Sequence, residues 1–156
     1  MKEEEVILVD VNDTPVGTMP KMEAHEKAIL HRAFSVFILN KEGQLMLQQR
    51  ALHKYHSPGL WTNTCCSHQR MGETNLEAGA RRLQEEMGFV TELSEVTSFI
   101  YKAPFDNGLT EHEFDHVLVL LRFPSVSFPS SSVEQHCKTR AYIRDLFSAQ
   151  PFRWNS

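Results

Sequence analysis

Short stretches in which β-branched and aromatic residues recur predict most of the secondary structure of this 156-residue chain. We expect strands at residues 6–10, 33–39, 44–49, 96–101 and 114–121. Turn-forming sequences separate them: Asp-Thr-Pro after the first strand, Asn-Lys-Glu-Gly between the second and third, and Asp-Asn-Gly between the last two. This spacing predicts a protein rich in short strands.

One long helix interrupts the strands. Residues 74–87 carry apolar side chains at helical spacing, with Thr74 or Asn75 available as the N-cap and Gly88 placed where a helix commonly ends. The predicted buried stripe consists of Leu76, Ala80, Leu83 and Met87. The order of strands, helix and further strands predicts an α/β protein with a mixed sheet.

The composition changes after Leu121. Residues 123–132 contain two prolines and five serines and predict a loop, while residues 141–147 predict a short helix. A chain of this length has room for a hydrophobic core, so we expect one domain over residues 1–156. Within it, residues 122–156 form an atypical C-terminal segment.

The charge of the chain narrows the choice of partner. The net charge of −4 predicts no general attraction to nucleic acid or to an anionic membrane, so a basic site for an anion must be local. No apolar run approaches the roughly 20 residues that span a bilayer, and the acidic start is unlike a signal peptide. Three cysteines, two of them adjacent, fit a reducing compartment. We expect a cytoplasmic monomer that binds a small molecule.

Candidate chemistry is concentrated in Trp-Thr-Asn-Thr-Cys-Cys-Ser-His, residues 61–68, and in Glu-His-Glu, residues 111–113. Alternate residues of a strand point to the same face, so Glu111 and Glu113 converge while His112 points away. Imidazoles together with carboxylates suit Mn, Fe or Zn better than Mg. Each feature taken alone also fits a solvated surface residue, which is the commoner case for a single histidine.

In order and spacing these residues resemble type 1 isopentenyl diphosphate isomerase, a member of the Nudix superfamily, over about residues 5–119. The helix and the residues before it also resemble the Nudix box, through Ser67, Glu73, Arg81, Arg82, Leu83, Glu85, Glu86, Gly88 and Phe89. Ser67 replaces a glycine of that motif, and Arg82 replaces a glutamate. The resemblance implies a Nudix-like α/β/α sandwich with a mixed sheet.

The resemblance also implies the reaction, which interconverts isopentenyl and dimethylallyl diphosphates through a carbocation in isoprenoid biosynthesis. It implies proton transfer by Cys66 and Glu113. It implies one divalent metal, Mn, Zn or Mg, and a second ion, Mg²⁺, that arrives with the substrate diphosphate and is approached by Glu86. The implied ligands of the first metal are His25, His31, His68, Glu111 and Glu113. The implied substrate contacts are Lys21, Arg50, Lys54, Ser67, Arg82 and Tyr101.

The likeness stops where, in the family, a later helix brings a tryptophan over the substrate. Trp154 is the remaining indole near the end of this chain, and Trp61 and Tyr101 are alternative neighbours for a carbocation. The divergent segment leaves three readings open: a damaged isomerase, a variant ending that covers the site, or a metal-binding relative with altered activity. A Nudix pyrophosphohydrolase is the other alternative, although Arg82 should weaken its multi-metal site.

Overall fold

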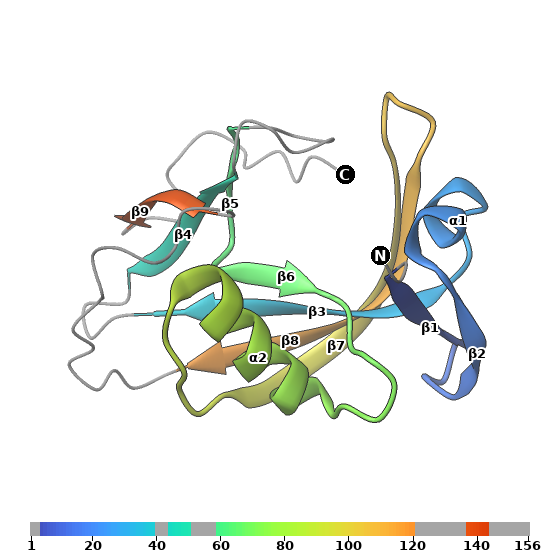
Figure 1. Ribbon diagram of the computed structural model, residues 1–156, viewed down its shortest axis with the longest axis horizontal. Helices are drawn as coiled ribbons and strands as arrows, with labels where there is room; N and C mark the ends of the chain where they lie inside the picture. The colour runs from blue at the N-terminus through green and yellow to red at the C-terminus, as the bar shows by residue number, and fades with distance from the viewer. Residues whose placement is uncertain (1–3, 40–43, 51–58, 121–136, 144–156) are drawn as a thin grey trace.

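The computed structural model of the chain describes residues 4–39, 44–50, 59–120 and 137–143 (Figure 1). The elements are β1 (Glu5–Val9), β2 (Pro15–Pro20), α1 (Lys21–Glu26), β3 (His31–Ile38), β4 (Leu45–Arg50), β5 (Trp61–Thr62), β6 (Cys65–Ser67), α2 (Asn75–Met87), β7 (Ser94–Pro104), β8 (Thr110–Leu120) and β9 (Cys137–Ile143). Neither helix among these residues is long and apolar enough to cross a membrane.

Most strands belong to one mixed sheet with the order β2-β1-β3-β8-β7, and β6 pairs with β3 outside this path. β3 and β8 run parallel, which sets His31 opposite Glu113. The other pairings in this sheet are antiparallel. A smaller sheet, with the order β5-β4-β9, stands to one side of the main sheet (Figure 1). The parallel pairing of β3 with β8 thus brings together two regions that are far apart in the sequence.

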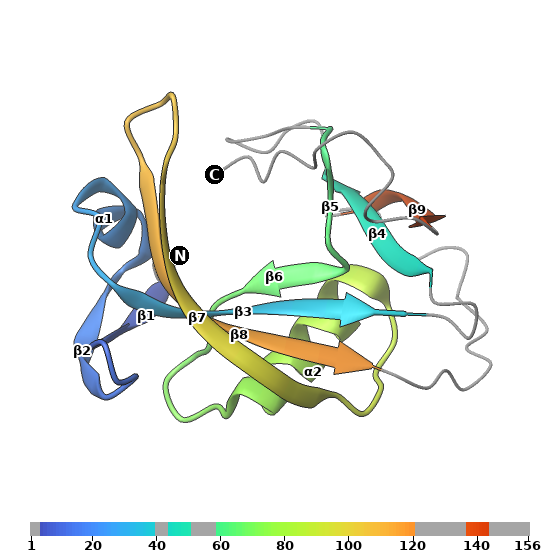
Figure 2. The same cartoon turned by 180° about the vertical axis from the view of Figure 1, so that it is seen from behind.

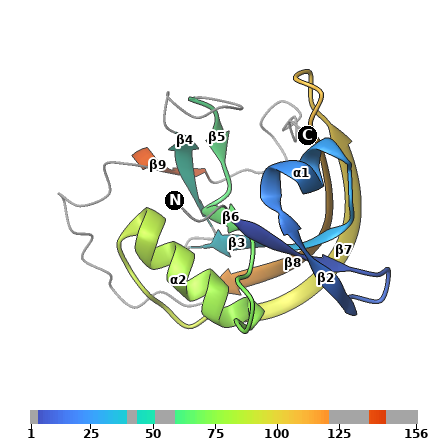
Figure 3. The same ribbon diagram turned by 45° about the vertical axis from the view of Figure 1, so that its right-hand side comes forward.

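Helix α2 lies across one face of the main sheet (Figure 3). Its start is fixed by a capping box, in which the Thr74 hydroxyl accepts from the Glu77 backbone N–H and the Glu77 carboxylate accepts from the Thr74 backbone N–H. Gly88 ends the helix at φ 76°, the left-handed conformation that favours glycine. The predicted helix and both of its caps are therefore present.

The buried stripe of α2 differs from the predicted one. Leu76 is 43% exposed, whereas Ala78 and Gly79 are buried together with Leu83 and Met87. The reason is close packing at Gly79, where an added Cβ would lie 2.6 Å from Leu118 Cδ1. The helix thus presents its glycine to the sheet. The core to which the helix and the sheet both contribute contains Phe34, Val36, Ile38, Met46, Cys65, Ala78, Leu83, Met87, Phe89, Leu118 and Leu120.

The five predicted strands are all present, with shifted ends, and β8 begins early enough to include the Glu-His-Glu sequence. The strands β2, β5 and β6 and the helix α1 were not predicted. The helix predicted at residues 141–147 is wrong where the structure describes it, because residues 141–143 belong to β9 and pair with β4. That long-range pairing overrides local helix preference. The turn at residues 40–43, the loop at 123–132 and residues 144–147 lie outside the described residues.

The face of the main sheet opposite α2 carries the predicted chemistry. Alternation along β3 and β8 directs His31 and Ser35, together with Glu113 and Asp115, away from the helix. The β7–β8 hairpin extends past the main sheet on this side, next to α1 (Figure 2). Strand alternation and the hairpin together set the position of the candidate site.

Candidate metal centre and its surroundings

Four buried side chains from separate parts of the chain form a compact group. His25 lies on α1, His31 on β3, His68 directly after β6, and Glu113 on β8. One potential ligand atom from each lies within 4.8 Å of the others. The parallel β3–β8 register contributes two of the four, since His31 and Glu113 are direct partners. Imidazoles and a carboxylate gathered in this way have the donor chemistry of a divalent metal site.

The backbone fixes two of the imidazole rings. Nδ1 of His25 lies 2.7 Å from the Lys21 carbonyl oxygen, and Nδ1 of His31 lies 2.7 Å from the Ile29 carbonyl oxygen. A proton on each Nδ1 donates to these carbonyls and leaves each Nε2 with its lone pair available. Nε2 of His31 and Nδ1 of His68 are buried and have no hydrogen-bond partner among the described residues. This group therefore fits a divalent metal ion.

Glu113 is the carboxylate at the centre of the group. The Tyr101 hydroxyl donates to Glu113 Oε2 at 2.6 Å, and His68 Nε2 lies 3.2 Å from Oε1. His31 Nε2 lies 3.6 Å from the same oxygen, which is too long for a hydrogen bond. Burial raises the pKa of Glu113, but the contacts with His31, His68 and Tyr101 outweigh burial and hold that pKa well below its usual range. Glu113 is therefore ionised at neutral pH.

The protonation state of His68 complements that of Glu113. Burial lowers the pKa of His68 to about 4, although the neighbouring Glu113 carboxylate acts in the opposite direction. A histidine with this pKa is neutral at pH 7. Neutral imidazole is the form that binds a metal ion, so the group needs no proton release from His68 before it can bind one.

Glu111 lies beside the four-residue group and is not part of it. The two glutamates share a face as predicted, because the Tyr101 hydroxyl contacts both, at 3.0 Å from Glu111 Oε2 and 2.6 Å from Glu113 Oε2. Burial, followed by the two carboxylates, raises the pKa of Tyr101 far above its usual value. The Tyr101 hydroxyl thus stays protonated and able to donate a hydrogen bond. It connects Glu111, the predicted fifth ligand, with Glu113.

The two adjacent cysteines point to opposite faces of β6. Cys65 is buried against the core, where burial raises the pKa of its thiol well above the usual value. Cys66 is exposed and pairs with Ser35 of β3, on the face that also bears Glu113. Strand alternation thus places Cys66 on the face where the resemblance expects a proton carrier, and leaves Cys65 in the core.

Ser67 occupies the first position of the Nudix-like motif. It is buried and pairs with Phe34 of β3. Among the described residues, Asp13 and Ala28 are the non-glycine positions with positive φ, so Ser67 does not adopt the left-handed conformation. The serine therefore fits this position at the end of β6 without backbone strain.

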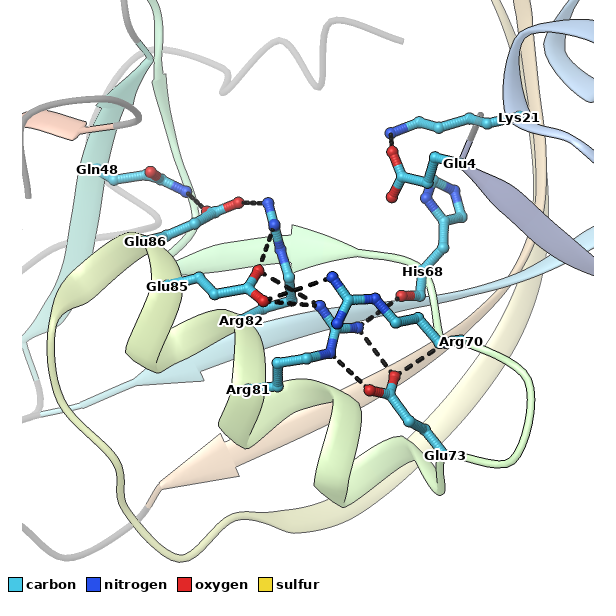
Figure 4. A network of polar contacts seen from close by, with 10 residues as sticks. All are labelled: Glu4, Lys21, Gln48, His68, Arg70, Glu73, Arg81, Arg82, Glu85 and Glu86. Atoms are coloured by element: carbon cyan, nitrogen blue, oxygen red, sulfur yellow. Dashed lines mark hydrogen bonds and ion pairs between the residues drawn. The ribbon is translucent and has the colours of Figure 1, made fainter. Parts of the chain in front are cut away.

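The remainder of the motif forms a network of paired charges on α2 (Figure 4). Arg81 donates to both Glu73 oxygens, at 2.6 and 2.9 Å, and to the His68 carbonyl oxygen at 3.3 Å. Glu85 is paired with Arg82 at 2.7 Å and with Arg81 at 3.4 Å. Arg81 therefore connects the helix directly to the segment that carries His68.

Glu86 is buried at the end of this network and already has two partners. Gln48 Nε2 of β4 donates to Glu86 Oε2 at 2.9 Å, and Arg82 donates to Oε1. Sequence analysis missed Gln48, because its partner Glu86 lies on another element and no local pattern links the two residues. A metal ion at Glu86 would therefore have to compete with Arg82 for the carboxylate.

The predicted diphosphate contacts are described in part. Lys21, the first residue of α1, donates from Nζ to Glu4 Oε2 at 3.3 Å. Arg82 lies on α2 near Glu86. Arg50 ends β4 but its side chain is not described, and Lys54 lies outside the described residues. Sequence analysis did not identify Glu4 as a neighbour of Lys21.

Asp115, also missed, is buried on the same face as Glu113, and burial raises its pKa to about 7. Asp115 could have been found from the Glu-x-Glu-x-Asp alternation of residues 111–115, which places all three carboxyl groups on one face of a strand.

Trp61 on β5 is 39% exposed, whereas Trp154 lies outside the described residues. Among the aromatic candidates that the structure describes, Tyr101 is the one in contact with Glu113.

Comparison with known proteins agrees with this geometry. Residues 29–137 match the NUDIX domain family. Isopentenyl-diphosphate Delta-isomerase of Serratia proteamaculans is 56% identical over 117 residues, which is 75% of this chain and 65% of that protein. The proteins of the same name from Burkholderia multivorans and Photobacterium profundum are 56% and 54% identical, again over 75% of this chain, and the match covers 66% and 68% of their lengths.

Solved structures show the same fold at low sequence identity. A crystal structure of a Deinococcus radiodurans protein has a TM-score of 0.67 and 20% identity, with 90% of this chain and 83% of that chain covered. A MutT protein from Methanosarcina mazei has a TM-score of 0.57 and 14% identity, with 73% and 76% covered. The expected Nudix-like α/β fold with a mixed sheet is therefore confirmed.

These matches place the chain in a class and then in a group within that class. The chain belongs to the NUDIX domain family and, within it, to the isopentenyl-diphosphate Delta-isomerases. It spans about two thirds of the length of the curated relatives that it matches, 65% and 66% for the first two.

Proposed function

We propose that the protein interconverts isopentenyl and dimethylallyl diphosphates, as the names of its relatives suggest. The observation that carries the proposal is the buried group of His25, His31, His68 and Glu113. Its carboxylate is held by Tyr101, and Cys66 projects from the same face of the sheet. Moving a C=C bond requires one proton added to an alkene carbon and another removed two carbons away. An ionisable carboxyl group and a thiol supply these two functions.

We assign a divalent metal ion to the four-residue group, with Glu111 as a fifth ligand. Three imidazole nitrogens favour Mn or Zn over Mg. When Glu113 carries a proton during the reaction, a bound cation makes that proton more acidic, which suits protonation of a weakly basic alkene. Two ring nitrogens are oriented by backbone carbonyls, and Tyr101 orients the two carboxylates. These contacts pre-organise the ligands before any ion binds.

In this proposal Glu113 and Cys66 exchange protons with the substrate. The hydrogen bond from Tyr101 sets the orientation of the Glu113 carboxylate. The aromatic ring of Tyr101 offers its face to the developing carbocation, an interaction that contributes about 1–2 kcal/mol when water is excluded. Cys66 is the second proton carrier, and the core position of Cys65 excludes Cys65 from this role.

Lys21, Arg50, Lys54 and Arg82, with a hydrogen bond from Ser67, are proposed to hold the diphosphate. Mg²⁺ that accompanies the diphosphate is expected to approach Glu86. Glu86 is oriented by Gln48 and paired with Arg82, so Mg²⁺ would have to displace Arg82 from this carboxylate. The proposed monomeric state, single domain and cytoplasmic location remain predictions from the sequence.

The second candidate, pyrophosphate hydrolysis, is not favoured by the charge network on α2. Arg82 stands where the Nudix motif has a glutamate, and it pairs with both Glu85 and Glu86. A cation in this position neutralises carboxylates that would otherwise gather several Mg²⁺ ions. The described network therefore supports isomerase activity over hydrolase activity.

The test is to incubate the metal-loaded protein with isopentenyl diphosphate and Mg²⁺ in deuterated water and to follow the substrate by NMR. We expect deuterium incorporation and formation of dimethylallyl diphosphate. Both should be lost in Cys66→Ala and in Glu113→Gln, while Cys65→Ala serves as the matched thiol control and keeps activity. Phosphate release without deuterium exchange would identify a hydrolase. A folded, metal-bound protein without either reaction would overturn the isomerase proposal and favour a metal-binding relative with altered activity.

A further inference from the structure

Glu4 and Lys21 are connected twice, through main chain and side chain. The Glu4 carbonyl oxygen accepts from the Lys21 backbone N–H at 2.8 Å. The Glu4 carboxylate accepts from Lys21 Nζ at 3.3 Å. Figure 4 shows this carboxylate beside the imidazole of His68, on the side of the molecule that carries the candidate site. Lys21, which the proposed function assigns to the diphosphate, is thus already paired with the Glu4 carboxylate.

The electrostatic surroundings of Glu4 are those expected for a bound anion. Burial raises the pKa of the Glu4 carboxyl, but Lys21, His68 and Arg82 together outweigh burial and lower that pKa below its usual value. Lys21 and Arg82 come from α1 and α2, so positive groups from two separate elements act on this one carboxylate. On a chain of net charge −4, the Lys21 ammonium is thus a local positive charge at which anions can compete.

The side chain of Glu4 can move while its backbone stays in place. The first pair of the β1–β2 ladder, Glu5 with Pro20, and the Lys21 N–H bond hold the main chain. The Glu4 side chain is 57% exposed, whereas that of Lys21 is 24% exposed. Rotation of Glu4 into solvent therefore requires no loss of strand pairing and leaves the Lys21 ammonium at the site.

We propose that Glu4 is an internal competitor of the substrate diphosphate: its carboxylate pairs with Lys21 in the free protein and rotates into water when the diphosphate binds. The Glu4 carboxylate and the diphosphate repel each other beside the one ammonium, so the Glu4–Lys21 ion pair breaks when the diphosphate binds. Loss of a partly exposed ion pair changes a binding equilibrium by about two- to five-fold. Glu4 thereby determines affinity and takes no part in proton transfer. The identity of the anion rests on the proposed function.

The test compares Glu4→Gln with Glu5→Gln. Both variants remove one negative charge, but Glu4 is the residue whose carboxylate accepts from Lys21 Nζ. Binding of inorganic pyrophosphate with Mg²⁺ is measured by calorimetry, together with KM and kcat for isopentenyl diphosphate. We expect Glu4→Gln to bind pyrophosphate about two- to five-fold more tightly and to lower KM to the same extent, with kcat unchanged. The gain should shrink at about 1 M salt, where charges are screened within about 3 Å.

A Lys21→Met background provides the second part of the test. In that background Glu4→Gln should no longer change pyrophosphate affinity, because the ammonium for which the two anions compete is missing. Weaker or unchanged binding by Glu4→Gln in the otherwise native protein would overturn the inference, as would an equal gain from Glu5→Gln. Failure of the native protein to bind pyrophosphate would overturn it too. Tighter binding without any isomerisation would support the role of Glu4 and contradict the proposed function.

Discussion

The two polar clusters of this protein, the His/Glu group and the charge network on α2, are built in opposite ways. The first has three imidazoles and one carboxylate, with His31 Nε2 and His68 Nδ1 lacking hydrogen-bond partners among the described residues. The second pairs Arg81 and Arg82 with Glu73, Glu85 and Glu86. Ring nitrogens without hydrogen-bond partners, next to a carboxylate, are suited to bind a cation. Charges that already neutralise each other are suited to hold a helix and a loop together.

The largest expected effect comes from breaking the first cluster at its centre. Glu113→Gln keeps the size of the side chain but removes the charge that faces His31 and His68. We expect the affinity for Zn²⁺ or Co²⁺ to fall by more than the roughly 10–100-fold that loss of a supporting group costs. Competition with a metallochromic chelator measures this affinity. Glu111→Gln, at the proposed fifth ligand outside the group of four, should lose less affinity. An equal loss in both variants would contradict the central position of Glu113.

Tyr101→Phe should have the next largest effect. It removes the hydroxyl that lies within hydrogen-bond distance of both carboxylates and leaves the ring in place. We expect metal affinity to fall by about 10–100-fold, because the carboxylates lose the group that orients them. The same titration checks this variant. Unchanged affinity would show that the tyrosine does not position Glu113.

Gln48→Leu tests the second cluster. It removes the hydrogen bond to buried Glu86, which keeps its contact with Arg82. We expect a loss of about 1 kcal/mol in the free energy of unfolding, measured by urea denaturation of the metal-free protein. Metal binding at the His/Glu group should be unchanged. A large loss of that binding would show that the two clusters are coupled more tightly than their separate contacts indicate.

The smallest effect is expected at the solvent-facing end of the network, and it depends on pH. The hydrogen bond from Arg81 lowers the pKa of Glu73. A lowered folded-state pKa contributes stability above the unfolded value of about 4.3, and this contribution is lost as pH falls through the folded-state pKa. We expect Glu73→Gln to cost about 1 kcal/mol or less at pH 7 and nearly nothing at about pH 2, measured by urea midpoints. An equal cost at both pH values would contradict this account.

Local sequence rules predicted those parts of the molecule that depend on neighbouring residues. Thr74 and Gly88 cap α2 because capping depends on a few adjacent residues. Glu111 and Glu113 share a face because a strand alternates at every residue. The three histidines were identified through the resemblance to a known family, and the structure places them together.

Long-range packing decided what local rules could not. The pairing of Leu47 with Ala141 makes β9 a strand where local pattern predicted a helix. Close contact at Gly79 turns α2 so that Leu76 faces solvent. Gln48 and Glu4 acquire their partners through contacts between elements far apart in the sequence. No short window of residues contains this information, because the sheet and helix must first be assembled.

The assembly of the metal ligands from separate elements, including the parallel pair β3 and β8, has a consequence for thermal stability. The proposed metal ligands span residues 25 to 113, so an unfolded chain must close several loops before it can present them together. We therefore expect a divalent ion to bind the folded chain far better than the unfolded one and to raise the apparent melting temperature with its free concentration. Chelation would consequently act as a mild denaturant, and the thermal stability of two preparations is comparable only at matched metal content.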